Sequence, residues 1–356
     1  MCPAISAAMF GHNFAPLMPD LCRTLAGAMR RRLLLLLLTC AIGGLYLANA
    51  SWLAPRPRGA PQVVAQRGLS QSYAGGINED ACTAQLIRLP VHQYIDNTLP
   101  SVGAAFSAGA QIVEVDARIT LDQQFVLFHD DRLECRTDGH GRISAHTVAQ
   151  LQTLDVGYGY TADHGQSYPL RGKGTRLMPT LGEALSQSPQ GHFLVQIKDG
   201  DPRVADRLVT YLGHPGADVW NRVSFFGAIA PLRRLQQIVP QARVWSGQSV
   251  GRCGTGYLEA GWFGHVPRVC DQGMIMVPIE QAAIFWGWPN RFLARMRAHH
   301  TQVMLFGKIE SISDRRFSRL DTLDEVSRIP EGFDGLIWTD RIDVVGPALR
   351  SKRIGP

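Results

Sequence analysis

The sequence predicts an irregular (β/α)8 barrel, of the TIM-barrel type, that follows an N-terminal hydrophobic segment. Three observations predict this fold: apolar runs recur along the chain, amphipathic stretches separate many of them, and about 290 residues follow the hydrophobic segment. Continuous apolar strands joined by helices are typical of a parallel sheet whose outer face is covered. Eight or nine such strands in a domain of this size favour a closed eight-stranded barrel over an open sheet.

Each element follows from its local pattern. The apolar strand candidates lie at 62–66, 111–117, 124–129, 192–198, 222–226, 242–246, 273–278, 302–306 and 335–340. The amphipathic stretches expected to be helical lie at 98–110, 178–187, 202–212 and 290–300. Because nine strand candidates exceed the eight of a barrel, one strand is expected outside it. The connection from Asp116 to Phe125 is too short for a crossover helix, which makes the early repeat irregular.

The first sixty residues contain a segment typical of membrane targeting. Three arginines at 30–32 precede an uncharged stretch at 33–54, which is long enough to cross a bilayer at about 20 residues. The arginines are expected to stay cytoplasmic, so the following domain is predicted to be exported or anchored on the extracytoplasmic (periplasmic) side. Residues 48–50, Ala-Asn-Ala, also resemble a signal-peptidase site, so a cleaved signal and a retained anchor both remain open. A buried core helix is the less favoured alternative.

These features divide the chain into four predicted parts. A tail at 1–32 is cytoplasmic or, if translation starts at Met29, partly untranslated. A transmembrane anchor or signal peptide at 33–54 and a linker at 55–61 precede the barrel domain at 62–350. The formal net charge is +6, and the tail with its four Arg and one Asp supplies half of it. Because the mildly basic remainder has no Lys/Arg stripe with interleaved aromatics, we expect no nucleic-acid partner.

Cysteine usage agrees with export. Cys82, Cys135, Cys253 and Cys270 lie in the barrel domain. In an oxidising compartment these four residues can form two disulfides by any of three connectivities, and four separate buried thiols are the alternative. No pair has C-x-x-C spacing, so the sequence does not support a structural zinc site.

Carboxylates within one predicted strand indicate a metal site. Glu114 and Asp116 alternate with Val115, so their side chains project from the same side of the strand. Buried charges are costly unless they are paired or bound to a cation. With one further oxygen ligand the two carboxylates suit a hard cation such as Ca²⁺ or Mg²⁺. Salt bridges with Arg118 or Lys198 are the alternative.

An ordered set of motifs extends along the predicted barrel domain: QRG at 66–68, the stretch at 96–141 that begins DNTLP, TLDVG at 153–157, MPTLGEAL at 178–185, QIK at 196–198 and GLIWTD at 335–340. This set resembles the glycerophosphodiester phosphodiesterase family, within the superfamily of phospholipase C-like phosphodiesterase barrels. The resemblance extends from about residue 63 to 343. It implies an eight-stranded α/β barrel that uses a divalent cation, Ca or Mg, to hydrolyse glycerophosphodiesters to glycerol phosphate and an alcohol.

The resemblance also assigns roles by position. Glu114 and Asp116 match the family's metal-binding E-x-D pair, and His129 matches its second catalytic histidine. Arg67 matches the arginine of its H-R-G turn, and Lys198 matches the lysine of its E-x-K strand. These types suit the chemistry, since an anionic phosphodiester needs its charge neutralised before attack at phosphorus. Proton transfer to and from oxygen suits two imidazoles.

Three positions depart from the family pattern. Gln66 stands where the first catalytic histidine is expected, Gln196 replaces the third metal carboxylate, and Asp96 replaces the glutamate of E-N-T. The segment at 68–96 is long for the family and contains His92, which is a candidate replacement base. We therefore expect a weakened metal-dependent hydrolase in lipid metabolism that acts on a small-molecule or lipid-derived phosphodiester. The alternatives are an inactive relative that binds phosphodiesters without turnover and a lysophospholipase D-like lipid phosphodiesterase.

Overall fold

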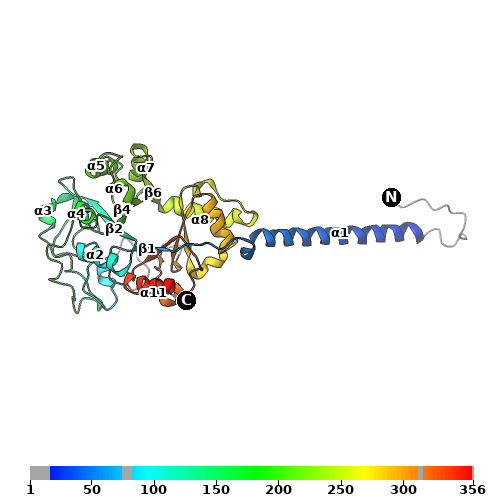
Figure 1. The fold of residues 1–356 in the computed structure, drawn as a ribbon, viewed down its shortest axis with the longest axis horizontal. Helices are drawn as coiled ribbons and strands as arrows, with labels where there is room; N and C mark the ends of the chain where they lie inside the picture. The colour runs from blue at the N-terminus through cyan, green and yellow to red at the C-terminus, as the bar shows by residue number, and fades with distance from the viewer. Residues whose placement is uncertain (1–16, 74–81, 312–315, 355–356) are drawn as a thin grey trace, which may run out of the picture.

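The computed structural model describes residues 17–73, 82–311 and 316–354, and it places an α/β barrel at the end of one long helix (Figure 1). The strands are β1 (Gln62–Ala65), β2 (Ile112–Ile119), β3 (Phe125–Leu127), β4 (His192–Ile197), β5 (Val223–Gly227), β6 (Arg243–Ser246), β7 (Met274–Pro278), β8 (Gln302–Phe306), β9 (Ile309–Ser311), β10 (Arg316–Phe317) and β11 (Leu336–Thr339). The α-helices are α1 (Leu17–Asn49), α2 (Leu99–Ala108), α3 (Val148–Leu151), α4 (Leu181–Gln187), α5 (Arg203–Leu212), α6 (Val219–Arg222), α7 (Ile229–Ile238), α8 (Gly247–Ala260), α9 (Asn290–Ala298), α10 (Leu323–Ser327) and α11 (Ile342–Ile354).

The parallel strands form a nearly closed barrel, as the sequence predicts. Their order is β6-β5-β4-β2-β1-β11-β8-β7, and the end strands β6 and β7 are not paired with each other among the described residues. Strand β3 pairs with β2 in the antiparallel direction, outside this ring, with Phe125 opposite Ile119. The predicted extra strand is therefore β3, and the short connection before it forms a hairpin instead of a crossover.

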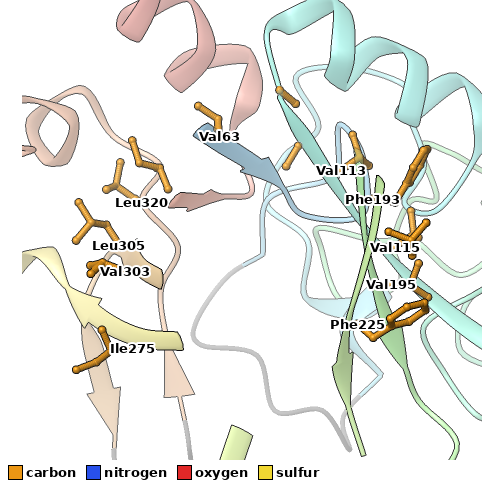
Figure 2. Close-up of a cluster of buried hydrophobic side chains, with 14 of the residues drawn as sticks. Val63, Val113, Val115, Phe193, Val195, Phe225, Ile275, Val303, Leu305 and Leu320 are labelled. Atoms are coloured by element: carbon orange, nitrogen blue, oxygen red, sulfur yellow. The ribbon is translucent and has the colours of Figure 1, made fainter. Parts of the chain in front are cut away.

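Alternation along the strands separates the outer core from the barrel interior. Val113 and Val115 of β2 belong to the large apolar cluster between the sheet and its covering helices (Figure 2). Glu114 and Asp116 alternate with these valines in sequence and project to the opposite side of the strand. In the parallel register of β2 with β4, Asp116 is the direct neighbour of Gln196. The alternating pattern thus brings polar side chains of two strands together inside the barrel.

Helix α8 is the longest barrel helix that the sequence patterns did not predict. Its sequence, GQSVGRCGTGYLEA, contains four glycines, each of which costs about 1 kcal/mol relative to alanine within a helix. The helix is stabilised by its N-terminal cap and by contacts with the rest of the domain. Ser246 and Ser249 form a capping box at its start, Tyr257 is buried in the core, and Cys253 is bonded to Cys270.

Both predicted disulfides are present in the structure. They join Cys82 to Cys135 and Cys253 to Cys270, which selects one of the three connectivities. The first links the segment after β1 to the loop after β3, and the second links α8 to the short 3-10 helix η5 (Arg268–Cys270). The alternative of four separate thiols is wrong.

Helix α1 projects from the barrel as one continuous rod (Figure 1). By its length and composition the portion Gly27–Asn49 could cross a membrane, and its most apolar 18-residue stretch has no buried residue. The alternative of a buried core helix is therefore wrong. The helix begins at Leu17, within the predicted tail, and residues 1–16 of that tail lie outside the described residues.

Candidate active site

Asp116 is a fully buried carboxylate at the centre of a polar cluster in the barrel. Arg67 Nε lies 2.9 Å from its Oδ2, and Lys198 Nζ lies 3.5 Å from its Oδ1. Asn97 donates its Nδ2 to Oδ2 over 2.9 Å and accepts the backbone N–H of Asp116 over 3.0 Å. Burial alone would raise the pKa of Asp116, but Arg67 and Lys198 outweigh it and hold that pKa well below its ordinary value. Asp116 is therefore ionised and held in one orientation.

The turn after β1 positions Arg67. Arg67 and Gly68 both have positive φ angles, 53° and 83°. A Cβ atom at Gly68 would lie 2.4 Å from Ser101 Oγ, so the close approach of α2 requires glycine there. The same turn directs the backbone N–H of Arg67 to Glu114 Oε2 over 3.1 Å. The QRG stretch therefore contacts both carboxylates of β2, one through its backbone and one through its side chain.

Three oxygen-bearing side chains adjoin one another where a divalent cation is expected. One terminal atom of the Gln196 amide lies 3.2 Å from Glu114 Oε1 and 2.9 Å from Asp116 Oδ1. With its nitrogen in that place the amide donates to both carboxylates, and with its oxygen there the three residues present an all-oxygen ligand set that suits a hard cation. No group of three or more His, Cys, Asp or Glu among the described residues could hold a metal ion, and at this place the third residue is an amide. The residues fit a cation, with one negative charge fewer than three carboxylates would give.

The pKa of Glu114 makes this cation affinity sensitive to pH. Burial and the neighbouring Asp116 raise the pKa of Glu114 to about 8, so below that pH a cation must displace a proton. We expect Ca²⁺ affinity to rise about tenfold per unit from about pH 6 to about pH 8 and then to level off. Calorimetric titration in buffers of different ionisation enthalpy measures both the affinity and the proton released. Glu114→Gln should bind more weakly and lose the pH dependence, and an affinity of the unmodified chain that is independent of pH would contradict the assignment.

His129 is oriented by its neighbour Asp130. The imidazole Nδ1 lies 2.6 Å from Asp130 Oδ1, and Arg136 Nε donates to Asp130 Oδ2 over 2.9 Å. His129 Nε2 is buried and has no hydrogen-bond partner among the described residues. Burial and the charge of Arg67 lower the pKa of His129 to about 3, so the ring is neutral at pH 7. With the proton on Nδ1 directed to Asp130, Nε2 is free to accept a proton.

The disulfide between Cys82 and Cys135 adjoins the network that holds this histidine. The residues that follow the two cysteines are Thr83 and Arg136, and Arg136 Nη2 donates to Thr83 Oγ1. Arg136 in turn holds Asp130 and pairs with Asp96 at 3.3 Å. Arg136 therefore connects the disulfide to the carboxylate that orients His129.

Removing this disulfide should weaken both stability and catalysis. In the chain-entropy relation a loop closed over 53 residues is worth about 4 kcal/mol, and one closed over 17 residues about 3 kcal/mol. Replacing Cys82 and Cys135 by alanine should therefore lower the free energy of unfolding and also lower kcat. Replacing Cys253 and Cys270 is the matched control, which should lower stability and leave kcat within about twofold. Equal kcat in the two variants would contradict the link from the disulfide to His129.

Gln66 is held by an arginine from a distant part of the chain. Arg319 Nε donates to Gln66 Oε1 over 3.3 Å, and its guanidinium stacks over the Trp338 ring at 4.0 Å. Arg319 is buried, with 7% of its surface exposed. Asp340 Oδ1 lies 3.9 Å from Arg319 Nε, beyond hydrogen-bond distance, and burial together with Asp321 raises the pKa of Asp340 to about 7. A fixed positive charge thus lies beside the position where the family pattern has a histidine.

His92 lies at the edge of this cluster. Its Nδ1 is 3.2 Å from Gln71 Nε2, and its ring is tilted against Tyr94 with 5.6 Å between centroids. Gln71 in turn donates its backbone N–H to Asp96, the partner of Arg67. Among the described residues His92 has no hydrogen bond to the carboxylates of β2 or to His129, so it is not placed as a replacement base.

Sequence reasoning did not identify Asp130, Arg136, Arg319 or Asp340 as parts of the site. Asp130 directly follows the predicted strand at 124–129, and Asp340 is the last residue of the predicted strand at 335–340, so their positions at strand ends were a signal that could have found them. Arg136 and Arg319 lie in loops, where no local pattern indicates that a side chain turns inward. Arg319 in particular follows the β9–β10 hairpin and belongs to no motif.

Comparisons with known proteins agree with this architecture. The barrel is similar to the glycerophosphoryl diester phosphodiesterase domain of an uncharacterized protein from Mycobacterium tuberculosis, with TM-score 0.58, 18% identity and coverage of 82% of this chain and 99% of that one. A putative glycerophosphoryl diester phosphodiesterase from Silicibacter pomeroyi gives TM-score 0.54 at 16% identity, with coverage of 86% and 98%. At such identities the likeness shows the fold alone.

Sequence similarity to known relatives is higher in identity but covers a smaller part of the chain. A putative glycerophosphodiester phosphodiesterase of Bacillus subtilis is 36% identical over 75 residues, which are 21% of this chain and 31% of that relative. A glycerophosphodiester phosphodiesterase of the same organism is 27% identical over 123 residues, 33% of this chain and 41% of that relative. The matched stretches therefore span less than half of these relatives.

The fold defines a TIM-barrel-like protein with a polar cluster where its strands end, the position at which such barrels carry their sites. Residues 67–210 match the model of the Glycerophosphoryl diester phosphodiesterase family. This match agrees with the resemblance that the motifs carry, and it covers less than half of the chain. The match begins at Arg67 and includes every site residue predicted from the sequence except Gln66, which immediately precedes it.

Proposed function

We propose that this chain hydrolyses glycerophosphodiesters to glycerol phosphate and an alcohol, with the aid of a divalent cation and at a reduced rate. The observation that carries the proposal is the buried Nε2 of His129, which is neutral, has no hydrogen-bond partner among the described residues, and lies within electrostatic range of Arg67 and Asp116. The match of residues 67–210 to a family of phosphodiesterases supports the reaction class.

The site residues have separate roles in the proposed reaction. Arg67 and Lys198 supply positive charge to the phosphoryl oxygens, and their pairing with Asp116 holds them in place before substrate arrives. Glu114, Asp116 and Gln196 would hold the divalent cation, which when bound withdraws charge from the phosphoryl group. His129 Nε2 accepts the proton of the attacking oxygen, and Asp130 stabilises the imidazolium that forms.

Protonation of the leaving oxygen is the step that this arrangement supports least. It needs a proton, and Gln66 carries none that it can transfer near neutral pH. Burial lowers the pKa of Arg319 beside it, but a guanidinium does not lose its proton in proteins, so Arg319 offers positive charge and no transferable proton. Water must then protonate the leaving oxygen. The Gln66–Arg319 contact also favours the second candidate function, which is binding of phosphodiesters without turnover.

An assay of the purified full chain separates the two functions. We expect release of glycerol phosphate from glycerophosphocholine with added Ca²⁺ or Mg²⁺ and none in chelator, and lysophosphatidylcholine tests the lipid alternative. His129→Gln should lower kcat by about 10²–10⁴-fold. His299→Gln is the matched control, because His299 forms the same kind of pair with Asp271, over 2.7 Å, on the surface. Binding without turnover under every condition would establish the binding function.

A further inference from the structure

The carboxyl end of α1 is bonded into the barrel domain. Asn49 Nδ2 donates to the Trp262 carbonyl over 2.6 Å. Arg295 donates to Asn49 Oδ1 over 3.0 Å, to the Ala48 carbonyl over 3.1 Å and to the Gly261 carbonyl over 3.0 Å. One arginine of α9 thus joins the last turn of α1 to the short 3-10 helix η4 (Gly261–Phe263), and the helix end is fixed against the domain.

The chain just after α1 is also part of the domain. Ser51 Oγ accepts the backbone N–H of Asn290 over 2.9 Å, at the start of α9. Ala50 and Ala54 are buried, with 5% and 6% of their surface exposed. The segment between α1 and β1 therefore does not act as a free linker at its beginning, and the direction of α1 is set by the barrel.

Large apolar side chains surround this junction and are exposed. They are Trp52, Leu53, Trp262 and Phe263, with exposed fractions of 67%, 46%, 44% and 58%. We call these four residues the aromatic collar. The Trp262 and Phe263 rings pack edge to face with centroids 4.8 Å apart, so they form one apolar surface. Exposed apolar residues gathered at one place mark an interaction surface, unlike those scattered singly.

The length of the apolar helix places the collar at the surface of a bilayer. A hydrocarbon core of about 30 Å takes about 20 helical residues. Counted from Leu33, the first residue after the arginines, this length ends near Trp52. Tryptophan is enriched at that depth because its ring is apolar and its N–H is polar. Since Asn49 is bonded to Trp262, the Trp262–Phe263 pair lies next to the same end of the helix.

We propose that the aromatic collar inserts into the headgroup region of the membrane that α1 crosses, and that Arg295 holds the barrel against this membrane in one orientation. The partner is the lipid bilayer, since the collar lies next to the end of a helix that is apolar enough to cross a membrane and has no buried residue in its most apolar 18-residue stretch. The proposal requires that α1 is retained as an anchor. It does not depend on the proposed hydrolysis.

Tryptophan fluorescence of the full chain in nanodiscs tests the collar. The measurement is the emission in phosphatidylcholine brominated near the headgroup, divided by the emission in unbrominated lipid. Trp262→Phe removes a quenched fluorophore, so the ratio should rise. Trp220→Phe is the control, because Trp220 is 6% exposed in α6 and its removal takes away unquenched emission, so the ratio should fall. A ratio that stays constant or falls for Trp262→Phe overturns the proposal.

A second variant tests the role of Arg295 in holding the barrel against the bilayer. Arg295→Gln should raise the ratio by freeing the barrel from the bilayer, while adding Trp52→Phe to it should raise the ratio further, because Trp52 stays next to the helix. An unchanged ratio for Arg295→Gln, with folding confirmed by circular dichroism, overturns the role of Arg295. Recovery of a soluble chain that begins at Ser51 overturns the whole proposal, because α1 would then have been removed.

Discussion

Asp116→Ala is expected to abolish turnover and to destabilise the barrel by about 3–5 kcal/mol. The loss of stability follows from Arg67, which is buried and would keep its charge with Asp96, at 3.6 Å, as its one remaining carboxylate partner among the described residues. The loss of activity follows because Asp116 both orients Arg67 and belongs to the oxygen ligand set. Chemical denaturation of the full chain in detergent and the glycerophosphocholine assay measure the two effects.

A surface aspartate provides the control for this prediction. Asp206 pairs with Arg234 at 2.7 Å, and both side chains are nearly half exposed. Such exposed pairs contribute about 0–1 kcal/mol, so Asp206→Ala should change stability little and leave kcat unaltered. If Asp116→Ala were as mild as Asp206→Ala, the barrel interior would be hydrated well enough to solvate Arg67 without a partner, and the buried cluster could not be preorganised for catalysis.

The strands could be predicted because their cause is local. Parallel strands buried on both faces need unbroken apolar runs, and Val113, Val115 and the residues of β4 carry that pattern in the sequence itself. Their alternation also predicts that Glu114 and Asp116 share a side, which is why the carboxylate pair could be found without a structure. Helix α8 could not be predicted in this way, because a disulfide and a buried tyrosine offset its glycines.

The missing parts of the site have non-local causes. Arg319 follows Gln66 by 253 positions, and the contact exists only because the end of the chain closes the barrel next to β1. No property of the segment around Arg319 indicates this, since an arginine after a hairpin is ordinarily solvated. The orientation of His129 likewise depends on Arg136, which a disulfide connects to the long segment at 68–96.

Gln66→His is expected to raise kcat, because it supplies a proton carrier at the position where the family pattern has one. A positioned general acid is worth about 10²–10⁴-fold, and we expect a measurable part of that factor. Gln196→Glu should separately tighten Ca²⁺ binding by restoring a third carboxylate. As a matched control, Gln71→His adds an imidazole outside the cation ligand set, beside His92, and should leave kcat unaltered.

Arg319 should limit the increase in kcat that Gln66→His produces. A histidine at position 66 would lie about 3 Å from a buried guanidinium, which disfavours the imidazolium needed to protonate the leaving oxygen. Gln66→His alone should therefore give a partial gain with an acid-shifted pH profile. Adding Arg319→Gln should raise kcat further and move the profile toward neutral pH, so the two changes should be more than additive. A different result would contradict this role of Arg319. If Gln66→His has no effect and His92→Ala abolishes turnover, the segment at 68–96 supplies the proton carrier, and Arg319 does not limit the rate.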